Sequence, residues 1–279
     1  MTRSQSKRNF LFWQVSFLPM SALIAMENVS VARDGKNILG PLTWSLNAGE
    51  RWVVIGPNGA GKTTFLQLAS ALLHPTTGTV EILGEKLGQV DIFEIRPRVG
   101  ICSSALSSLL REDEKVLDLV LTAAYGISGR WIEEYDLWDE SRAKALLDLF
   151  GVRELFDRSY GTLSEGERKR VQIARSLMTN PEILLLDEPA AGLDLGGRED
   201  ILSRLANYLN EEEAPASIIV THHIEEIPAG TTHVLLLRSG QIFRTGPIQT
   251  TLTESNINEL FSTNISLSFD GKRYFATSR

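Results

Sequence analysis

The stretch of sequence that decides the fold reads Gly56-Pro57-Asn58-Gly59-Ala60-Gly61-Lys62-Thr63, followed by Thr64. It matches the phosphate-binding pattern G-x-x-x-x-G-K-[ST]. Glycines let the backbone curl so that its N–H groups surround an anion, and the helix that begins at Lys62 adds the positive end of its dipole. All nine residues are therefore predicted to bind a nucleotide, with Lys62 on the β- and γ-phosphates and the Thr63 hydroxyl on Mg²⁺.

The segments on either side of this stretch predict a strand–loop–helix unit. A buried apolar run at 51–55 precedes it, and the residues 62–73 have apolar side chains at helical spacing. This setting argues against the alternative, which is a glycine-rich turn with a chance lysine.

Farther out, apolar residues follow strand and helix patterns in alternation. Strands are expected at 26–31, 42–46, 79–83, 99–102, 183–186 and 217–220, helices at 165–178 and 197–209, and a hairpin at 234–237 and 241–244. The uniformly apolar runs 183–186 and 217–220 are typical of parallel strands buried on both faces, so the expected fold class is α/β. After Pro247 a helix is expected at 257–261 and a strand pair around Asp270-Gly271.

One segment inside this pattern, from about 105 to 165, differs in character. Its charge is dense, and Ala143, Leu146, Leu147 and Phe150 recur at helical spacing. We interpret it as a helical subdomain inserted between two halves of the sheet. The expected organisation is a tail at 1–23, one domain at 24–250 and an extension at 251–279.

Composition narrows the class of protein. The 279 residues suffice for one large α/β domain or two small ones, and a hydrophobic share of 43% and a charged share of 23% are ordinary for a globular protein. A net charge of -7 argues against a nucleic-acid binder held by a broad basic surface. The single Cys102 excludes an internal disulfide. The histidines show no metal-ligand spacing, since His222 and His223 would point to opposite faces of a strand.

The N-terminal segment is similar to a secretory signal. Three basic residues precede apolar runs at 10–15 and 17–26, which are too short and interrupted for a membrane span of about 20 residues. Export is not expected, because the chain becomes domain-like immediately afterwards and its motifs need cytosolic ATP. Two alternatives stay open: translation begins at Met20 or Met26, or residues 1–23 form a disordered tail.

Four further motifs follow the phosphate loop. They are Leu163-Ser164-Glu165-Gly166-Glu167, Asp187-Glu188 after the strand 183–186, Gly192-Leu193-Asp194, and Thr221-His222. In this order they resemble the ABC ATPase family over roughly residues 24–247, with LSEGE in place of the usual LSGGQ. The resemblance implies a P-loop NTPase fold with a RecA-like, mostly parallel core, a small antiparallel β subdomain and an inserted helical subdomain. It also implies an enzyme that binds and hydrolyses ATP with Mg²⁺.

The two carboxylates after the buried strand form the expected catalytic centre, together with Lys62. Asp187 is expected to hold Mg²⁺, and Glu188 to take a proton from the attacking water. The resemblance makes His222 a sensor of the γ-phosphate. Taken alone, His222 would also suit a strand-end histidine satisfied by a backbone carbonyl, and Glu188 a carboxylate at a helix start beside Pro189.

The resemblance places Ser164 and Gly166 on the nucleotide of a second chain, with Asp194 also at the nucleotide. Two ATP sites would then be shared within one homodimer. The alternative for Ser164 is a helix N-cap that forms a capping box with Glu167, three residues on. Both roles are compatible.

Two positions depart from the family pattern. Arg33 lies where an aromatic residue usually stacks on adenine, and a guanidinium plane can also stack on a base; an exposed loop arginine is the alternative. Ser104 lies where a glutamine usually touches Mg²⁺ and responds to the membrane partner. A serine is shorter, which puts that coupling in doubt.

The favoured hypothesis is the energy-coupling ATPase of an importer, cytoplasmic or bound to the inner face of the membrane. The region 252–261 and the serines near Ser104 are similar to ATPases of molybdenum and metal-chelate importers. Because no membrane span is seen in the sequence, a separate permease would be the membrane partner. The rival hypothesis is a soluble ABC ATPase acting on nucleic acid or the ribosome. The chain has one nucleotide-binding domain, and about 100 residues separate the phosphate loop from the motif that begins at Leu163. Both features favour the transporter hypothesis.

Overall fold

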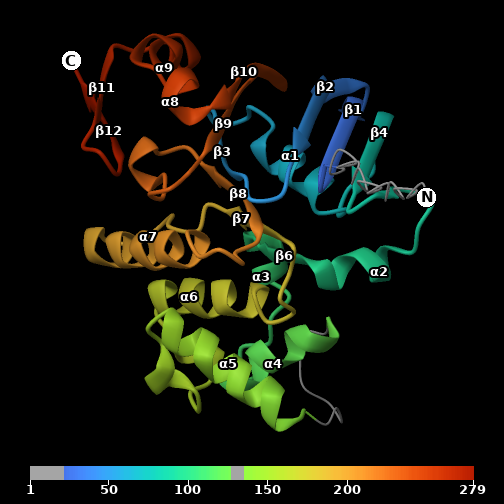
Figure 1. The fold of residues 1–279 in the computed structure, drawn as a ribbon, viewed down its shortest axis with the longest axis vertical. Helices are drawn as coiled ribbons and strands as arrows, with labels where there is room; N and C mark the ends of the chain where they lie inside the picture. The colour runs from blue at the N-terminus through green and yellow to red at the C-terminus, as the bar shows by residue number, and fades with distance from the viewer. Residues whose placement is uncertain (1–21, 127–134) are drawn as a thin grey trace, which may run out of the picture.

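The computed structural model describes residues 22–126 and 135–279. The expected N-terminal tail therefore lies almost wholly outside the described residues, as do residues 127–134 of the helical subdomain. Figure 1 shows a central sheet, an antiparallel sheet on one side of it and helices below.

The central sheet has the strand order β10-β9-β3-β8-β7-β6. Its members are β3 (Arg51–Ile55), β6 (Val99–Cys102), β7 (Ile183–Asp187), β8 (Ala216–Thr221), β9 (His233–Arg238) and β10 (Gln241–Pro247). Neighbouring strands are parallel from β9 to β6, and only the hairpin β9–β10 is antiparallel. The expected α/β class with a mostly parallel core is confirmed.

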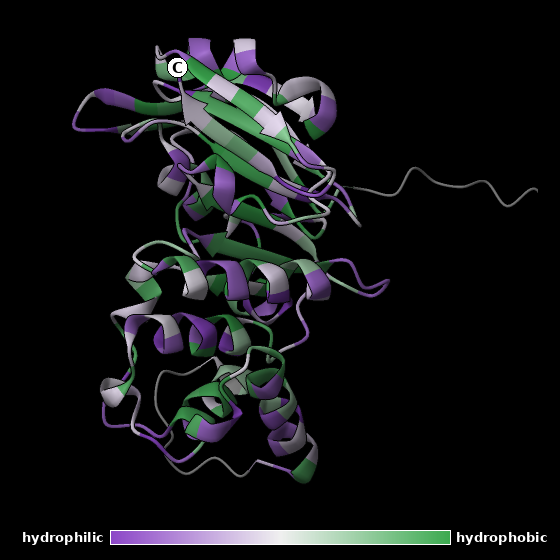
Figure 2. Cartoon of the chain, turned by 90° about the vertical axis from the view of Figure 1, so that its left-hand side faces the viewer, coloured by the Kyte–Doolittle hydropathy of each residue, from purple (hydrophilic) through white to green (hydrophobic). Residues whose placement is uncertain are grey.

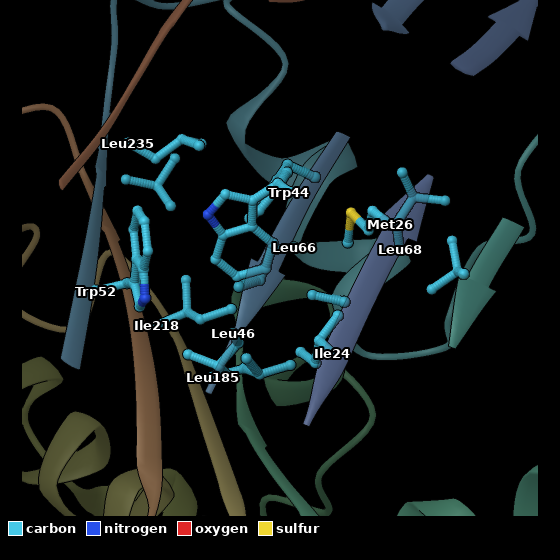
Figure 3. Close-up of a cluster of buried hydrophobic side chains, with 14 of the residues drawn as sticks. Ile24, Met26, Trp44, Leu46, Trp52, Leu66, Leu68, Leu185, Ile218 and Leu235 are labelled. Carbon is cyan, nitrogen blue, oxygen red and sulfur yellow. The ribbon is translucent and has the colours of Figure 1, made fainter. Parts of the chain in front are cut away.

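The second sheet is antiparallel, with the order β2-β1-β4-β5. It contains β1 (Ile24–Arg33), β2 (Lys36–Leu46), β4 (Thr77–Ile82) and β5 (Glu85–Lys86). Between the two sheets lie Trp44 of β2, Trp52 of β3 and helix α1 (Lys62–Ala69), as Figure 3 shows. The Trp44 ring packs edge-on against Trp52 and Phe65, with ring centroids 5.2 and 5.0 Å apart. These contacts fix the start of α1 against both sheets.

Helices α4 (Val116–Leu121), α5 (Leu137–Leu149), α6 (Glu165–Ser176) and α7 (Leu195–Leu209) cover the other face of the central sheet. Helix α2 (Ile92–Ile95) instead packs through Ile95 in the core on the α1 side. The remaining short elements are α3 (Ser104–Ser107) and the 3₁₀ turns η1 (Arg96–Arg98), η2 (Thr122–Tyr125), η3 (Arg153–Leu155), η4 (Tyr160–Thr162) and η5 (Ile224–Glu226). Figure 2 shows apolar residues, in green, concentrated on the strands, while the helices carry polar stripes.

Strand β7 shows why its sequence is apolar at every position. Leu184 and Leu186 pack in the core formed with α4 to α7, whereas Leu185 packs in the core on the α1 side. Successive side chains of a strand point to opposite faces, so a strand covered on both faces needs no polar residue.

The C-terminal region packs onto the same sheet. It contains α8 (Ile248–Thr251), α9 (Glu254–Phe261), β11 (Ile265–Phe269) and β12 (Tyr274–Ser278). Ile257 and Leu260 of α9 share a buried cluster with Val53 and Ile55 of β3. The helix and the strand pair expected after Pro247 are present, and their core is continuous with the central sheet.

Several expected bounds are wrong at the ends. The helix expected over 62–73 ends at Ala69, because Ala71 adopts a left-handed φ of 56°. The short elements β5 and α2 give no periodic pattern and were not expected. The hairpin turn is confirmed: Ser239 and Gly240 have φ of 52° and 77°, as a two-residue turn between twisted strands requires.

Candidate active site

The phosphate loop joins β3 to α1 and needs glycine for steric reasons. A Cβ on Gly56 would lie 2.3 Å from the carbonyl oxygen of Leu237 on β9. Gly61 has a φ of 98°, and a Cβ there would lie 2.9 Å from Leu39 Cδ1 of β2. Packing against both sheets thus excludes side chains, and the loop backbone stays free to face an anion.

Lys62 follows this loop at the first position of α1. Its Nζ donates to the carbonyl oxygens of Gly56 and Pro57 at 2.7 and 3.2 Å. Burial lowers the pKa of Lys62, while the charges of Glu188 and Asp187 act in the opposite direction. The cation therefore lies within the loop predicted to hold phosphates, and carboxylates are close enough to influence it.

The carboxyl end of β7 carries the two predicted catalytic carboxylates. Burial, and then the charge of Glu188, raise the pKa of Asp187, against the charges of Lys169 and Lys62. Glu188 adopts a left-handed φ of 49°, and its N–H donates to the carbonyl of Val220 at 2.9 Å. A non-glycine residue in this conformation costs free energy and occurs where the surroundings impose it.

His222 joins this pair from the neighbouring strand. Its Nδ1 lies 2.8 Å from Glu188 Oε1, and about a third of each side chain is exposed. The bond joins β7 and β8 at the edge where the carboxyl ends of parallel strands meet. The alternative, a histidine whose ring nitrogen is satisfied by a backbone carbonyl, does not hold for Nδ1, because Nδ1 contacts the Glu188 carboxylate.

The expectation that His222 and His223 point to opposite faces of a strand is wrong. Strand β8 ends at Thr221, so the alternation of a strand does not apply to the residues that follow. The two imidazole centroids are 4.0 Å apart. His223 itself is exposed, and its N–H donates to Thr221 Oγ1 at 3.0 Å.

A cavity of about 340 Å³ brings much of the predicted site together. It is lined by Thr63, Ser104, Glu165, Lys169, Asp187, Glu188, Ala191 and Gly192. Ser104, the first residue of α3, therefore lies beside the predicted metal ligands Thr63 and Asp187, although its side chain is shorter than the expected glutamine.

Two lining residues, Glu165 and Lys169, were not predicted. Lys169 Nζ donates to the carbonyl oxygen of Glu188 at 3.2 Å, so helix α6 directly contacts the residue that follows β7. Glu165 and Lys169 are four residues apart and hence on one helix face. The sequence shows this spacing, but it does not predict that this face of α6 packs against the end of β7.

The signature residues Ser164 and Gly166 do not line this cavity. Ser164 is exposed and caps α6: its Oγ accepts from Glu167 N at 3.4 Å, and its N–H donates to Glu167 Oε2 at 2.8 Å. The predicted capping box is confirmed. Hydrogen bonds from Ser164, the backbone one above all, hold the pKa of Glu167 below its usual range.

Asp194 and Arg33 also lie outside the cavity. Asp194 caps α7, with Oδ1 accepting from Gly197 N at 2.7 Å. Arg33 is exposed where β1 turns into β2. The β2 strand then reaches the phosphate loop, since a Cβ on Gly61 would lie 3.3 Å from the carbonyl oxygen of Ile38. The structure thus puts Arg33 on the strand pair beside the loop, without a contact that defines its role.

The oxygen donors present fit a magnesium ion that also binds phosphate. Among the described residues, no group of three or more His, Cys, Asp or Glu could hold a metal unaided. The Thr63 hydroxyl and the Asp187 carboxylate line one cavity, and Mg²⁺ is usually held by one or two carboxylates plus substrate phosphates.

Comparison with known proteins agrees with this geometry. Residues 39–191 match the sequence profile of the family described as ABC transporter. An ABC transporter ATP-binding protein of Streptococcus mutans is 39% identical over 91% of this chain and 98% of its own length. The ABC transporter ATP-binding protein YlmA of Bacillus subtilis is 38% identical, over 91% and 97%.

Solved structures of ATP-binding cassettes share the fold. A dimeric cassette in a post-hydrolysis state with ADP and phosphate has a TM-score of 0.70 and 26% identity, covering 81% of this chain and 98% of its own. CbiO1 of Clostridium perfringens, part of an ABC transporter complex, has 0.72 and 26%, covering 85% and 93%. A metal-chelate type ABC transporter has 0.71 and 25%, covering 91% and 96%. This chain belongs to the ABC transporter family, as one of its ATP-binding, ATP-hydrolysing subunits.

Proposed function

We propose that Glu188 is the general base of ATP hydrolysis and that His222 orients it. The observation that carries this is the 2.8 Å contact between Glu188 Oε1 and His222 Nδ1, beside the cavity that Thr63 and Asp187 line. A carboxylate held by a second group, and partly exposed, can accept a proton from water. The left-handed φ of Glu188 points to a conformation retained for its chemistry.

The remaining groups position the phosphates. Lys62, which now donates to loop carbonyls, would transfer its hydrogen bonds to the β- and γ-phosphates. Thr63 and Asp187 would hold Mg²⁺, which when bound neutralises charge that develops on the phosphoryl oxygens. Lys169, which lines the same cavity, donates to the carbonyl oxygen of Glu188 and helps to hold it in place.

A homodimer with two shared sites is the second part of the proposal. Ser164 is exposed and does not line the cavity beside its own Thr63, so another chain can approach it. A helix N-terminus suits a phosphate, and the Ser164 hydroxyl, which donates to Glu167 Oε2 at 2.8 Å in the single chain, would turn from that carboxylate to the ligand. The dimeric form of a similar cassette supports the arrangement.

Mixing two inactive variants tests the shared sites. Lys62→Ala disables the phosphate loop of its own chain, and Ser164→Asp places a charge against the nucleotide of the other chain while still capping the helix. A heterodimer of the two has both defects at one site and an intact second site. We expect an equal mixture, unfolded and refolded together, to recover up to about a quarter of wild-type ATPase activity, as random pairing in a C2 dimer allows.

Each variant alone must stay near zero, and a double variant carrying both changes, mixed with wild type, should lose both sites in every heterodimer. Recovery no greater than the sum of the two single variants would show that each chain binds ATP by itself and would contradict the shared sites.

We further propose that the chain drives a separate membrane subunit from the cytoplasmic face. No helix in the described ranges is long and apolar enough to cross a membrane. The support is the similarity to CbiO1, part of an ABC transporter complex. We expect faster ATP hydrolysis when the chain is reconstituted in lipid vesicles with a membrane protein encoded by a neighbouring gene than when it is alone. Equal rates with each such protein would contradict this role.

A further inference from the structure

The C-terminal hairpin β11–β12 contacts the segment that carries His222, the predicted sensor of the γ-phosphate. The 3₁₀ turn η5 follows His222 and His223 directly, and Glu225 is its middle residue. The Ala276 N–H of β12 donates to Glu225 Oε1 at 3.1 Å. Strand β12 thus contacts the turn η5, which follows His222, the predicted γ-phosphate sensor, by one residue.

Arg273, just before β12, extends this contact to a second element. One terminal nitrogen of its guanidinium donates to the carbonyl oxygen of Glu225, and the other to the Glu199 carboxylate of α7. The Arg273 side chain is only 17% exposed. Among the described residues Arg273 Nε is buried without a hydrogen-bond partner, so the charge-assisted bonds of the two terminal nitrogens are what hold the three elements in one arrangement.

Both elements that Arg273 joins lead into the site. Helix α7 begins at its cap Asp194, in the motif that follows Glu188. The segment before η5 carries His222, whose Nδ1 bonds Glu188 Oε1. On the inner side, Thr221 Oγ1 donates to the buried Glu226 at 2.5 Å and accepts from His223 N. Arg273 holds the same segment from its outer side.

We propose that Arg273 is a positioning residue for hydrolysis: it holds His222 against Glu188 from outside the site. The inference rests on the proposed roles of His222 and Glu188. Loss of the guanidinium frees η5 and α7 to shift, and small misplacements of a catalytic pair lower turnover strongly. Nucleotide affinity depends on the phosphate loop, which Arg273 does not touch. The effect therefore belongs to kcat and not to KM.

The test compares Arg273→Gln with Arg279→Gln, which removes a second arginine of the same hairpin that pairs with Glu254 at the surface. We expect Arg273→Gln to lower kcat roughly 10-fold or more, with KM for ATP within about twofold, since the change acts on positioning. Arg279→Gln should match wild type. Arg273→Lys should recover only part of the loss, because a single ammonium group cannot replace two terminal nitrogens that donate to acceptors on different elements.

A second measurement separates positioning from folding. In a His222→Ala background, Arg273→Gln should lower the residual rate no further, because both changes act on one contact. Labelled ATP over long incubations resolves such rates. The same proportional loss in both backgrounds, or wild-type kcat for Arg273→Gln, would overturn the proposal. If Arg273→Gln fails to fold, Glu199→Gln, which removes the ion pairs of Glu199 with Arg273 and with the neighbouring Arg198 but keeps the bond from Arg273 to the Glu225 carbonyl, takes its place with the same outcomes. A fully active His222→Ala would instead overturn the proposed function.

Discussion

The surroundings of Asp187 and Glu167 shift the pKa values of these two carboxylates in opposite directions. Asp187, at the end of β7, has a pKa raised by burial and by the adjacent Glu188. Glu167, in the first turn of α6, has a pKa lowered by hydrogen bonds from Ser164. The surroundings of Asp187 disfavour its ionised form, whereas the start of helix α6 favours the ionised form of Glu167.

The difference separates a strained region from a satisfied one. At the end of β7, the half-buried Asp187 carboxylate, a left-handed Glu188 and a partly desolvated Lys62 are kept close together. At the start of α6, a capping box satisfies the free backbone donors and leaves Ser164 exposed. The region at the end of β7 therefore keeps charges that its surroundings do not fully compensate, whereas the start of α6 has its polar groups satisfied within the chain. Stability and function often conflict in this way.

The largest effect is expected from removing the proposed general base at the end of β7. Glu188→Gln should keep ATP binding and lower turnover at least about 10²-fold, since general-base catalysis contributes that much or more. An ATP-bound dimer should accumulate, visible by gel filtration. Glu182→Gln is the control, because Glu182 is an exposed carboxylate just before the start of β7. Near wild-type turnover of Glu188→Gln would return Glu188 to a structural role.

Removing the charge of either Asp187 or Glu167 is expected to have a smaller effect, on the free energy of unfolding. In EDTA and without nucleotide, Asp187→Asn should raise the free energy of unfolding by roughly 0.5–2 kcal/mol, the range of single stabilising changes. Glu167→Gln should lower it by about 0.3–1 kcal/mol, the value of a carboxylate at a helix start. Both are isosteric losses of one charge, so only the surroundings differ. Urea unfolding at pH 7 measures them.

The difference in unfolding free energy between each variant and wild type is expected to depend on pH. The raised pKa of Asp187 makes its ionised form a cost that is present above the folded pKa and disappears as pH falls below the unfolded one. The lowered pKa of Glu167 makes its charge a gain that is present above the unfolded pKa and is lost as pH falls through the folded one. Both differences from wild type should therefore shrink in acid. Equal signs for the two variants at pH 7 would contradict the comparison.

The sequence alone determined the parts of this protein whose physics is local. Glycines and a lysine at fixed spacing define a phosphate loop, uniformly apolar runs define buried parallel strands, and Ser164 with Glu167 defines a capping box. Each depends on residues within a few positions of one another, so the hydrogen bonds and the conformations that they require are written in the chain order.

Only the tertiary structure decided which distant groups meet. Lys169 reaches the carbonyl of Glu188, and His222 meets the Glu188 carboxylate, because α6, β7 and β8 pack with their ends at one edge. Arg273, just before β12, joins α7 and η5. Nothing in the spacing of these residues predicts such pairs. Contacts between segments far apart in the chain depend on how the buried faces of the sheet are covered, and that is settled by packing of the whole core.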